Sequence, residues 1–179
     1  MIAPEMPAAV VVALLELFEK SGIKVWLDGG WGVDALLGTQ TRVHKDLDVI
    51  IGTAHVTRIV ELLSTRGYLV QHGGSDSNFV LAHPLGLEVD VHAVTFDNQS
   101  NGRYRLANGE EWMYPAAGFT GRGVIAGAPV RCLSPETQVL SHAYGYVPTD
   151  KDICDMERLR DRFGVELPAQ LQRSTSLDR

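Results

Sequence analysis

The sequence lacks several features that mark specialised classes of protein. It holds only two cysteines in 179 residues, Cys132 and Cys154, and they do not form a metal-ligand spacing. Such cysteine usage is typical of a reduced, cytoplasmic protein. The longest apolar run, AAVVVALL at residues 8–15, is far shorter than the roughly 20 residues that cross a bilayer. A basic excess is also missing, because 16 Lys and Arg stand against 22 Asp and Glu. We therefore expect a cytoplasmic protein that spans no membrane and binds no nucleic acid.

The order of the apolar patterns predicts an α+β fold with a mixed sheet. Hydrophobic residues make up 45% of the chain, which is enough for an ordinary core. The expected helices lie at 8–20, 31–37, 54–66, 135–144 and 150–162, and the expected strands at 24–28, 46–52, 68–72, 78–84 and 87–94. We expect a core unit at 1–95, a part with hairpins and C-terminal helices at 96–166, and a polar tail at 167–179.

A glycine-rich turn, VWLDGGWGVDALLG at residues 25–38, joins a short strand to a short helix. Gly29 and Gly30 let the backbone approach another group closely, and the helix that follows offers free N–H groups. A phosphate is the ligand that this combination suits. An ordinary tight turn is the alternative that the turn alone leaves open.

Carboxylates recur at strand spacing on two of the expected strands. Side chains alternate along a strand, so Asp46 and Asp48 share one face. Glu88, Asp90 and His92 share one face of the later strand in the same way. If both strands belong to one sheet, Asp46, Asp48 and Asp90 converge, and a hard divalent cation would offset their repulsion. A solvated sheet face is the alternative for each motif taken alone.

Together these motifs resemble one known group of enzymes. The segments GGWG, DLD and LEVD are similar to the polymerase-beta type nucleotidyltransferase superfamily. More narrowly, WLDGGWGVDALLGTQTRVHKDLDV resembles the small antibiotic nucleotidyltransferases, which include lincosamide nucleotidyltransferases and 2''-aminoglycoside adenylyltransferases. The resemblance covers most of residues 10–163. It implies a polymerase-beta-like core with C-terminal helices.

The resemblance also implies a reaction, in which AMP passes from ATP to a hydroxyl group and pyrophosphate is released. Magnesium would be the cofactor, bound by Asp46, Asp48 and Asp90, with Asp90 also acting as the general base. The nucleotide would contact Gly29, Gly30, Trp31, Arg42 and Lys45. For Trp31 the alternative is packing of the helix, because Trp is usually well buried.

The acceptor implied by the resemblance is a small antibiotic, touched by Glu88 and His92. The aminoglycoside branch carries an acidic residue two positions after the third aspartate, where this chain has His92, so a lincosamide is the first expectation. A 2''-aminoglycoside, a protein partner and a non-catalytic nucleotide-binding module are the alternatives. We expect a monomer or a homodimer.

One segment departs from the lincosamide pattern. Gly145-Tyr146, Asp152 and Asp155 fit it, but Ala143 stands where a histidine belongs and His142 comes one place early. One residue rotates a side chain by about 100° around a helix. The roles of His142, Asp152 and Asp155, as a cleft lining or as a solvated helix face, are therefore left open.

Overall fold

The computed structural model describes residues 5–106, 109–144 and 146–173. Gly145 and the part of the expected polar tail beyond residue 173 lie outside these ranges. The helices are α1 (Ala8–Lys20), α2 (Gly29–Leu37), α3 (Val56–Ser64), α4 (Pro135–Ala143) and α5 (Asp150–Phe163). The strands are β1 (Val25–Leu27), β2 (Asp46–Gly52), β3 (Leu69–Val70), β4 (Asn78–Ala82), β5 (Glu88–Phe96), β6 (Gly102–Arg105), β7 (Glu111–Tyr114), β8 (Arg122–Ile125) and β9 (Ala128–Arg131).

The main sheet is mixed, which confirms the predicted α+β class. Its central order is β1-β2-β5-β4-β3, and β6 and β7 continue from the end of β5. Strands β2 and β5 run parallel, and every other pair in this sheet is antiparallel. A separate hairpin, β8-β9, turns at Ala126 and Gly127, both with positive φ, as expected for a tight hairpin turn.

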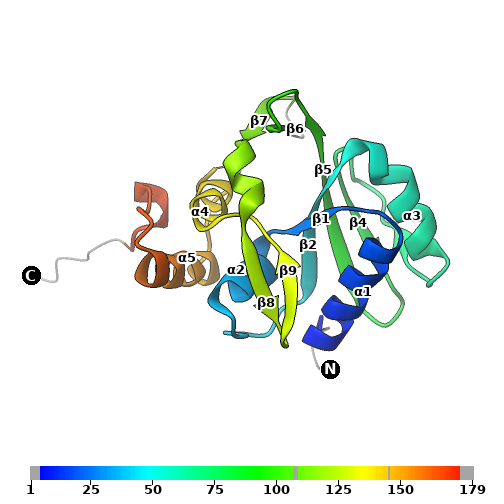
Figure 1. The fold of residues 1–179 in the computed structure, drawn as a ribbon, viewed down its shortest axis with the longest axis horizontal. Coiled ribbons are helices and arrows are strands. Elements are labelled where there is room, and N and C mark those ends of the chain that lie inside the picture. The colour runs from blue at the N-terminus through cyan, green and yellow to red at the C-terminus, as the bar shows by residue number, and fades with distance from the viewer. Residues whose placement is uncertain (1–4, 107–108, 145, 174–179) are drawn as a thin grey trace, which may run out of the picture.

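The two faces of the sheet are covered by different helices. Helices α1 and α3 lie on one side of the strands, and α4 and α5 lie on the other (Figure 1). The buried residues of β2 and β5 that alternate with the carboxylates pack into the cluster under α1 and α3; they are Leu47, Val49, Val89 and Val91. The opposite face of the same two strands is therefore free to carry polar groups.

The C-terminal helices pack on α2 rather than standing apart. Val33 of α2 shares one apolar cluster with Val139 of α4 and with Met156 and Leu159 of α5. Ser134 caps α4 by accepting a hydrogen bond from the Thr137 N–H at 3.3 Å, as its sequence position predicts. This cluster joins residues from both sides of position 95. The predicted division of the chain at that position stays a proposal.

Some element boundaries differ from those predicted. The expected strand 68–72 is reduced to Leu69–Val70, because both residues are exposed on the edge strand of the sheet. The helix expected at 54–66 begins with a 3-10 turn and is α-helical only over Val56–Ser64. No helix of the described ranges is long and apolar enough to cross a membrane.

Candidate active site

The parallel pairing of β2 with β5 brings the predicted carboxylates together. Asp48 stands directly opposite Asp90, and Asp46 stands opposite Glu88. Alternation along each strand places these side chains on the face away from α1 and α3. One strand register thus places Asp46, Asp48 and Asp90 on the same face of the sheet, with Asp48 and Asp90 directly opposite each other.

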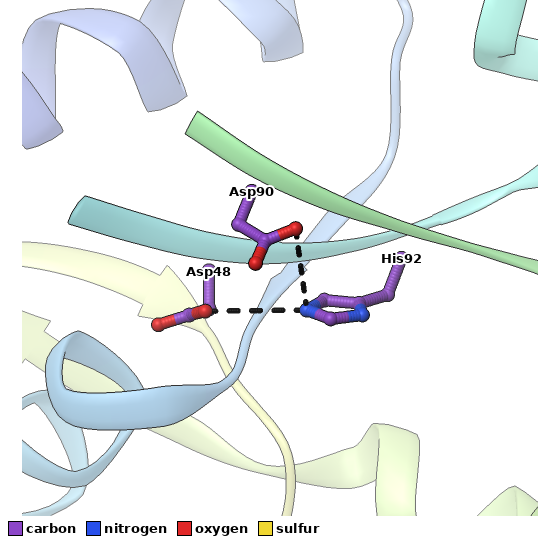
Figure 2. A group of neighbouring side chains, drawn as sticks. All are labelled: Asp48, Asp90 and His92. Carbon is purple, nitrogen blue, oxygen red and sulfur yellow. Dashed lines mark ion pairs between the residues drawn. The ribbon is translucent and has the colours of Figure 1, made fainter. Parts of the chain in front are cut away.

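His92 lies inside this carboxylate group rather than at its rim. Its Nε2 atom is 3.9 Å from Asp48 Oδ1 and 3.8 Å from Asp90 Oδ1 (Figure 2). Its Nδ1 atom is 3.2 Å from the hydroxyl of Tyr104, which also accepts a hydrogen bond from Asn78 Nδ2 at 2.8 Å. The imidazole ring is therefore held from one side by Tyr104 and faces the carboxylates with the other.

The electrostatics of the group show excess negative charge. Burial alone would raise the pKa of Asp48 and lower that of His92, but their mutual attraction outweighs burial and reverses both shifts. Burial raises the pKa of Asp90 to about 6, and the charges of Asp48 and Asp46 add to the rise. Burial and then repulsion from Asp48 also raise the pKa of Asp46. A bound cation would relieve these unfavourable charges.

These side chains fit a divalent cation. Asp48, Asp90 and His92 each offer one ligand atom, and the three atoms lie within 4.8 Å of one another. Asp90 Oδ1 is buried and has no hydrogen-bond partner within the described ranges, which is costly for an acceptor unless an ion or water binds it. Asp46 shares their face but is not part of this compact group. Its role as a metal ligand stays a proposal.

The glycine turn is packed against side chains of the same site. Asp28 caps α2 by accepting a hydrogen bond from the Gly29 N–H at 2.8 Å. Gly29 has φ +58, and a methyl group there would overlap the Asp48 carboxylate. A methyl group at Gly30 would overlap the His44 ring and the Arg42 guanidinium. The groups that come close to this backbone therefore include the Asp48 carboxylate and the Arg42 guanidinium. The Gly29 N–H already donates its hydrogen bond to Asp28.

The loop between α2 and β2 is fastened to α2 by a buried aspartate. Asp34 accepts hydrogen bonds from the Thr41 N–H at 3.0 Å and from its hydroxyl at 2.7 Å, and pairs with His44 Nε2 at 2.5 Å. His44 in turn lies 4.6 Å from the Trp31 ring, measured between ring centroids. Trp31 is only 2% exposed and belongs to the main core. Trp31 is therefore packed as the alternative of helix packing expects, and its predicted nucleotide contact stays a proposal.

Arg42 pairs with a residue that its position in the sequence does not suggest. Its Nε and Nη2 atoms donate to Asp155 Oδ2 at 3.0 and 2.8 Å, and Asp155 also accepts from Arg158 at 2.9 Å. Asp155 is buried, so this pair ties the loop before β2 to α5. Lys45, by contrast, is exposed beside Asp46. Of the two basic residues expected at the nucleotide, Lys45 is thus the one with its charge open to solvent.

We expect Asp155→Asn to lower the free energy of unfolding by about 1–3 kcal/mol, because it removes the charged acceptor of a partly buried guanidinium. Urea denaturation would measure the loss. Arg158→Gln is the matched control: the Arg158 side chain is 41% exposed, so its pair with Asp155 is worth less than about 1 kcal/mol. Equal losses for both variants would contradict a special role for the Arg42 pair.

Residues 10–159 match the sequence profile of the family described as aminoglycoside-2''-adenylyltransferase. The chain belongs to this family. The relationship identifies it as a nucleotidyltransferase, in agreement with the resemblance carried by its GGWG, DLD and LEVD segments.

Relatives of this adenylyltransferase family member come from both antibiotic branches. A lincosamide resistance protein of Staphylococcus haemolyticus is 29% identical over 147 residues, which cover 82% of this chain and 90% of that protein. A 2''-aminoglycoside nucleotidyltransferase of Escherichia coli is 28% identical over 135 residues, which cover 73% of this chain and 70% of that protein. The crystal structure of lincomycin-bound lincosamide adenylyltransferase LnuA superposes with a TM-score of 0.77, at 28% identity, covering 87% of this chain and 98% of that one.

The sequence leaves open the roles of His142, Asp152 and Asp155. In the structure each of them has hydrogen-bond partners within the protein. Asp152 accepts hydrogen bonds from the Thr149 N–H at 2.8 Å and its hydroxyl at 2.7 Å, so it is the N3 residue of a capping box whose N-cap is Thr149. His142 is buried, with Nδ1 at 2.7 Å from the Gln138 carbonyl oxygen. Asp152 and Asp155 are both buried, so they do not form a solvated helix face.

Two residues near the site are missed by sequence reasoning. Asp28 is only 8% exposed, and its Oδ1 also accepts from the Ser141 hydroxyl at 3.3 Å, which links the glycine turn to α4. Its place directly before two glycines and a helix is typical of a helix N-cap, so its role could have been predicted from the sequence. Tyr104, which holds His92, lies in a hairpin with no such signal.

Proposed function

We propose that this protein transfers AMP from ATP to a hydroxyl group of a small antibiotic and releases pyrophosphate. The observation that carries the proposal is the register of β2 and β5, which sets Asp48 opposite Asp90 beside the tight turn at Gly29. Membership of the adenylyltransferase family supports the reaction type. In such chemistry the protein contributes mainly positioning and charge neutralisation.

The carboxylates have distinct proposed tasks. Asp46, Asp48 and Asp90 would hold Mg²⁺, which when bound neutralises charge on the phosphates. Asp90 is also the proposed general base, which takes the proton of the acceptor hydroxyl; without a bound metal ion, burial raises the pKa of this carboxyl to about 6. The buried Asp90 Oδ1 atom, which lacks a hydrogen-bond partner within the described ranges, is available for one of these tasks.

The nucleotide phosphates are proposed to lie at the start of α2 and β2. The N-terminus of α2 at Gly29 and Gly30 favours negative charge, although the Gly29 N–H is already bonded to Asp28. Lys45 is exposed next to Asp46 and supplies a positive charge there. Arg42 contributes its charge at Gly30 while it stays paired with Asp155.

A lincosamide is the first proposed acceptor. The chain covers 90% of the lincosamide relative but 70% of the aminoglycoside relative. His92 stands two positions after Asp90, where the aminoglycoside branch is acidic, and its Nε2 atom lies 3.8 Å from Asp90 Oδ1 on the same face. Glu88, exposed opposite Asp46, is the second proposed acceptor contact. An aminoglycoside modified at its 2'' position is the alternative, because the matching family is described as aminoglycoside-2''-adenylyltransferase.

Pyrophosphate release tests the proposal directly. The protein is incubated with ATP and Mg²⁺ and with lincomycin, clindamycin, tobramycin or kanamycin, and an Asp48→Asn variant serves as the control. We expect release only when an acceptor is present, fastest with a lincosamide, and none above background with Asp48→Asn. Release with aminoglycosides alone would keep the reaction and replace the acceptor. A wild-type protein that releases nothing with all four would refute the antibiotic assignment.

A further inference from the structure

The face of β5 that carries Asp90 and His92 continues into a group of aromatic side chains. Val94 is the next residue of β5 on that face, and it belongs to a second apolar cluster together with Tyr104 and Tyr114. The β6-β7 hairpin, which supplies both tyrosines, extends from the end of β5 (Figure 1). Beyond His92, aromatic rings therefore follow the carboxylates along the same face.

Trp112 lies at the edge of this second cluster, beside the tyrosine that holds His92. It stands directly opposite Tyr104 in the pairing of β6 with β7, so the two side chains share one face. The rings of Tyr104 and His92 lie 5.7 Å apart, measured between centroids. Trp112 is only partly buried against the cluster, and its Nε1–H, although shielded from solvent, has no acceptor within the described ranges. A buried indole usually pairs this group, so packing alone does not account for Trp112.

Tyr144 meets Trp112 from the C-terminal end of α4. The two ring centroids lie 5.6 Å apart, with 32° between the ring planes, and Tyr144 is 47% exposed. Three residues earlier in the chain, the Ser141 hydroxyl donates to Asp28 Oδ1 at 3.3 Å, beside the glycine turn. Trp112 and Tyr144, which we call the aromatic platform, are therefore connected to the carboxylate site from two sides, through the β6-β7 hairpin and through α4.

The position of the aromatic platform favours the acceptor over the nucleotide. The phosphates are proposed to lie at the start of β2, beside Lys45 and Asp46. The platform lies toward the opposite end of the same pair of strands, beyond Asp90 and then His92. Because Asp90 is the proposed base for the acceptor hydroxyl, an acceptor with its hydroxyl at Asp90 would extend over His92 onto the platform.

We propose that the aromatic platform binds the acceptor antibiotic through an apolar ring face and a protonated amine. This inference rests on the proposed function. Aromatic faces pack against apolar rings and attract cations, and Trp attracts them most strongly. Within the described ranges the cation–π contacts of Lys and Arg involve Trp26 and Phe163, so no such side chain covers Trp112 or Tyr144. A lincosamide, with one amine and much apolar surface, has the chemistry that the platform suits.

Binding of antibiotic and of ATP by Trp112→Leu tests this proposal. Leucine keeps an apolar side chain at the edge of the cluster but has no ring face. We expect the Kd for lincomycin, measured by titration calorimetry without nucleotide, to rise about 5- to 30-fold, and the Kd for ATP with Mg²⁺ to stay unchanged. In turnover the KM for the antibiotic should rise while the KM for ATP does not. Trp112→Phe should recover part of the affinity, and Tyr144→Leu should weaken lincomycin binding in the same direction.

Met113→Ala is the matched control. Met113 is the neighbour of Trp112 on β7, so its side chain points to the opposite face, and it is 46% exposed. This substitution should leave both Kd values and both KM values unchanged.

The outcomes separate this inference from the function on which it rests. If Trp112→Leu binds lincomycin as tightly as the wild type, the inference fails, and pyrophosphate release decides the function separately. A raised Kd for ATP alone would assign the platform to the adenine base, and equal losses for both ligands would give Trp112 a structural role; either result overturns the inference. Weaker antibiotic binding without any turnover would support the inference and refute the function. Wild-type protein that binds none of lincomycin, clindamycin, tobramycin and kanamycin overturns the inference.

Discussion

Asp90→Asn is expected to lower the rate of AMP transfer by about 10²- to 10⁴-fold, the usual contribution of a general base. The amide has the shape of the carboxylate but cannot accept the acceptor proton, and it is a weaker ligand for a hard cation. Pyrophosphate release under saturating ATP and acceptor would measure the loss. Activity within a few fold of wild type would exclude Asp90 as the base.

The same substitution should leave the protein more stable, not less, when divalent metal is absent. The pKa of Asp90 is raised from 3.8 to about 6, so its ionised form is disfavoured in the folded state. A group with a raised pKa stabilises the fold below its unfolded value and loses that contribution as pH rises through the folded value. At pH 7 the ionised Asp90 therefore lowers the free energy of unfolding by about 1–3 kcal/mol. The uncharged amide of the variant does not carry this cost.

Thermal unfolding in EDTA at pH 7 would check this, with a rise of a few degrees expected for Asp90→Asn. The combination of lost turnover and raised Tm shows that inactivity does not come from misfolding. A lower Tm would instead mean that the carboxylate makes a stabilising contact through His92, 3.8 Å away.

The face shared by Asp46, Asp48 and Asp90 could be predicted because it depends on short-range rules. Alternation along a strand decides which residues share a face, and it needs no knowledge of distant parts of the chain. The end of α2 follows from a local rule as well, because Gly38, with φ +73, takes the left-handed conformation that commonly ends a helix. Both features are set by residues that are neighbours in sequence.

The partners of Arg42 and Trp31 could not be predicted, because each depends on tertiary packing. Asp155 lies 113 positions after Arg42, and no local pattern links the two. Trp31 is covered by the core and contacts His44, whose side chain is paired with Asp34 of the same helix. The position of His92 between the carboxylates likewise depends on Tyr104 from a hairpin outside the carboxylate strands.

Gly29→Ala is the second substitution for which we expect a large effect, and it separates packing from backbone strain. The new methyl group would overlap the Asp48 carboxylate, at a residue whose φ is +58. The left-handed conformation alone costs an L-residue about 1–2 kcal/mol, and Asp48 must also leave its place opposite Asp90. We therefore expect pyrophosphate release to fall at least about 10²-fold and Mg²⁺ binding, followed by calorimetry, to weaken with it.

Gly38→Ala is the control for the strain component of this prediction. Gly38 ends the same helix with φ +73, but nothing lies within 4 Å of a methyl group there. It should lose about 1 kcal/mol of stability and keep its activity, since the substitution moves no site residue. If Gly29→Ala behaves like Gly38→Ala, Asp48 tolerates displacement, and the tight turn serves the helix rather than the metal site. If only Gly29→Ala loses activity, the glycine is required because the carboxylate that holds the cation occupies the space of a side chain.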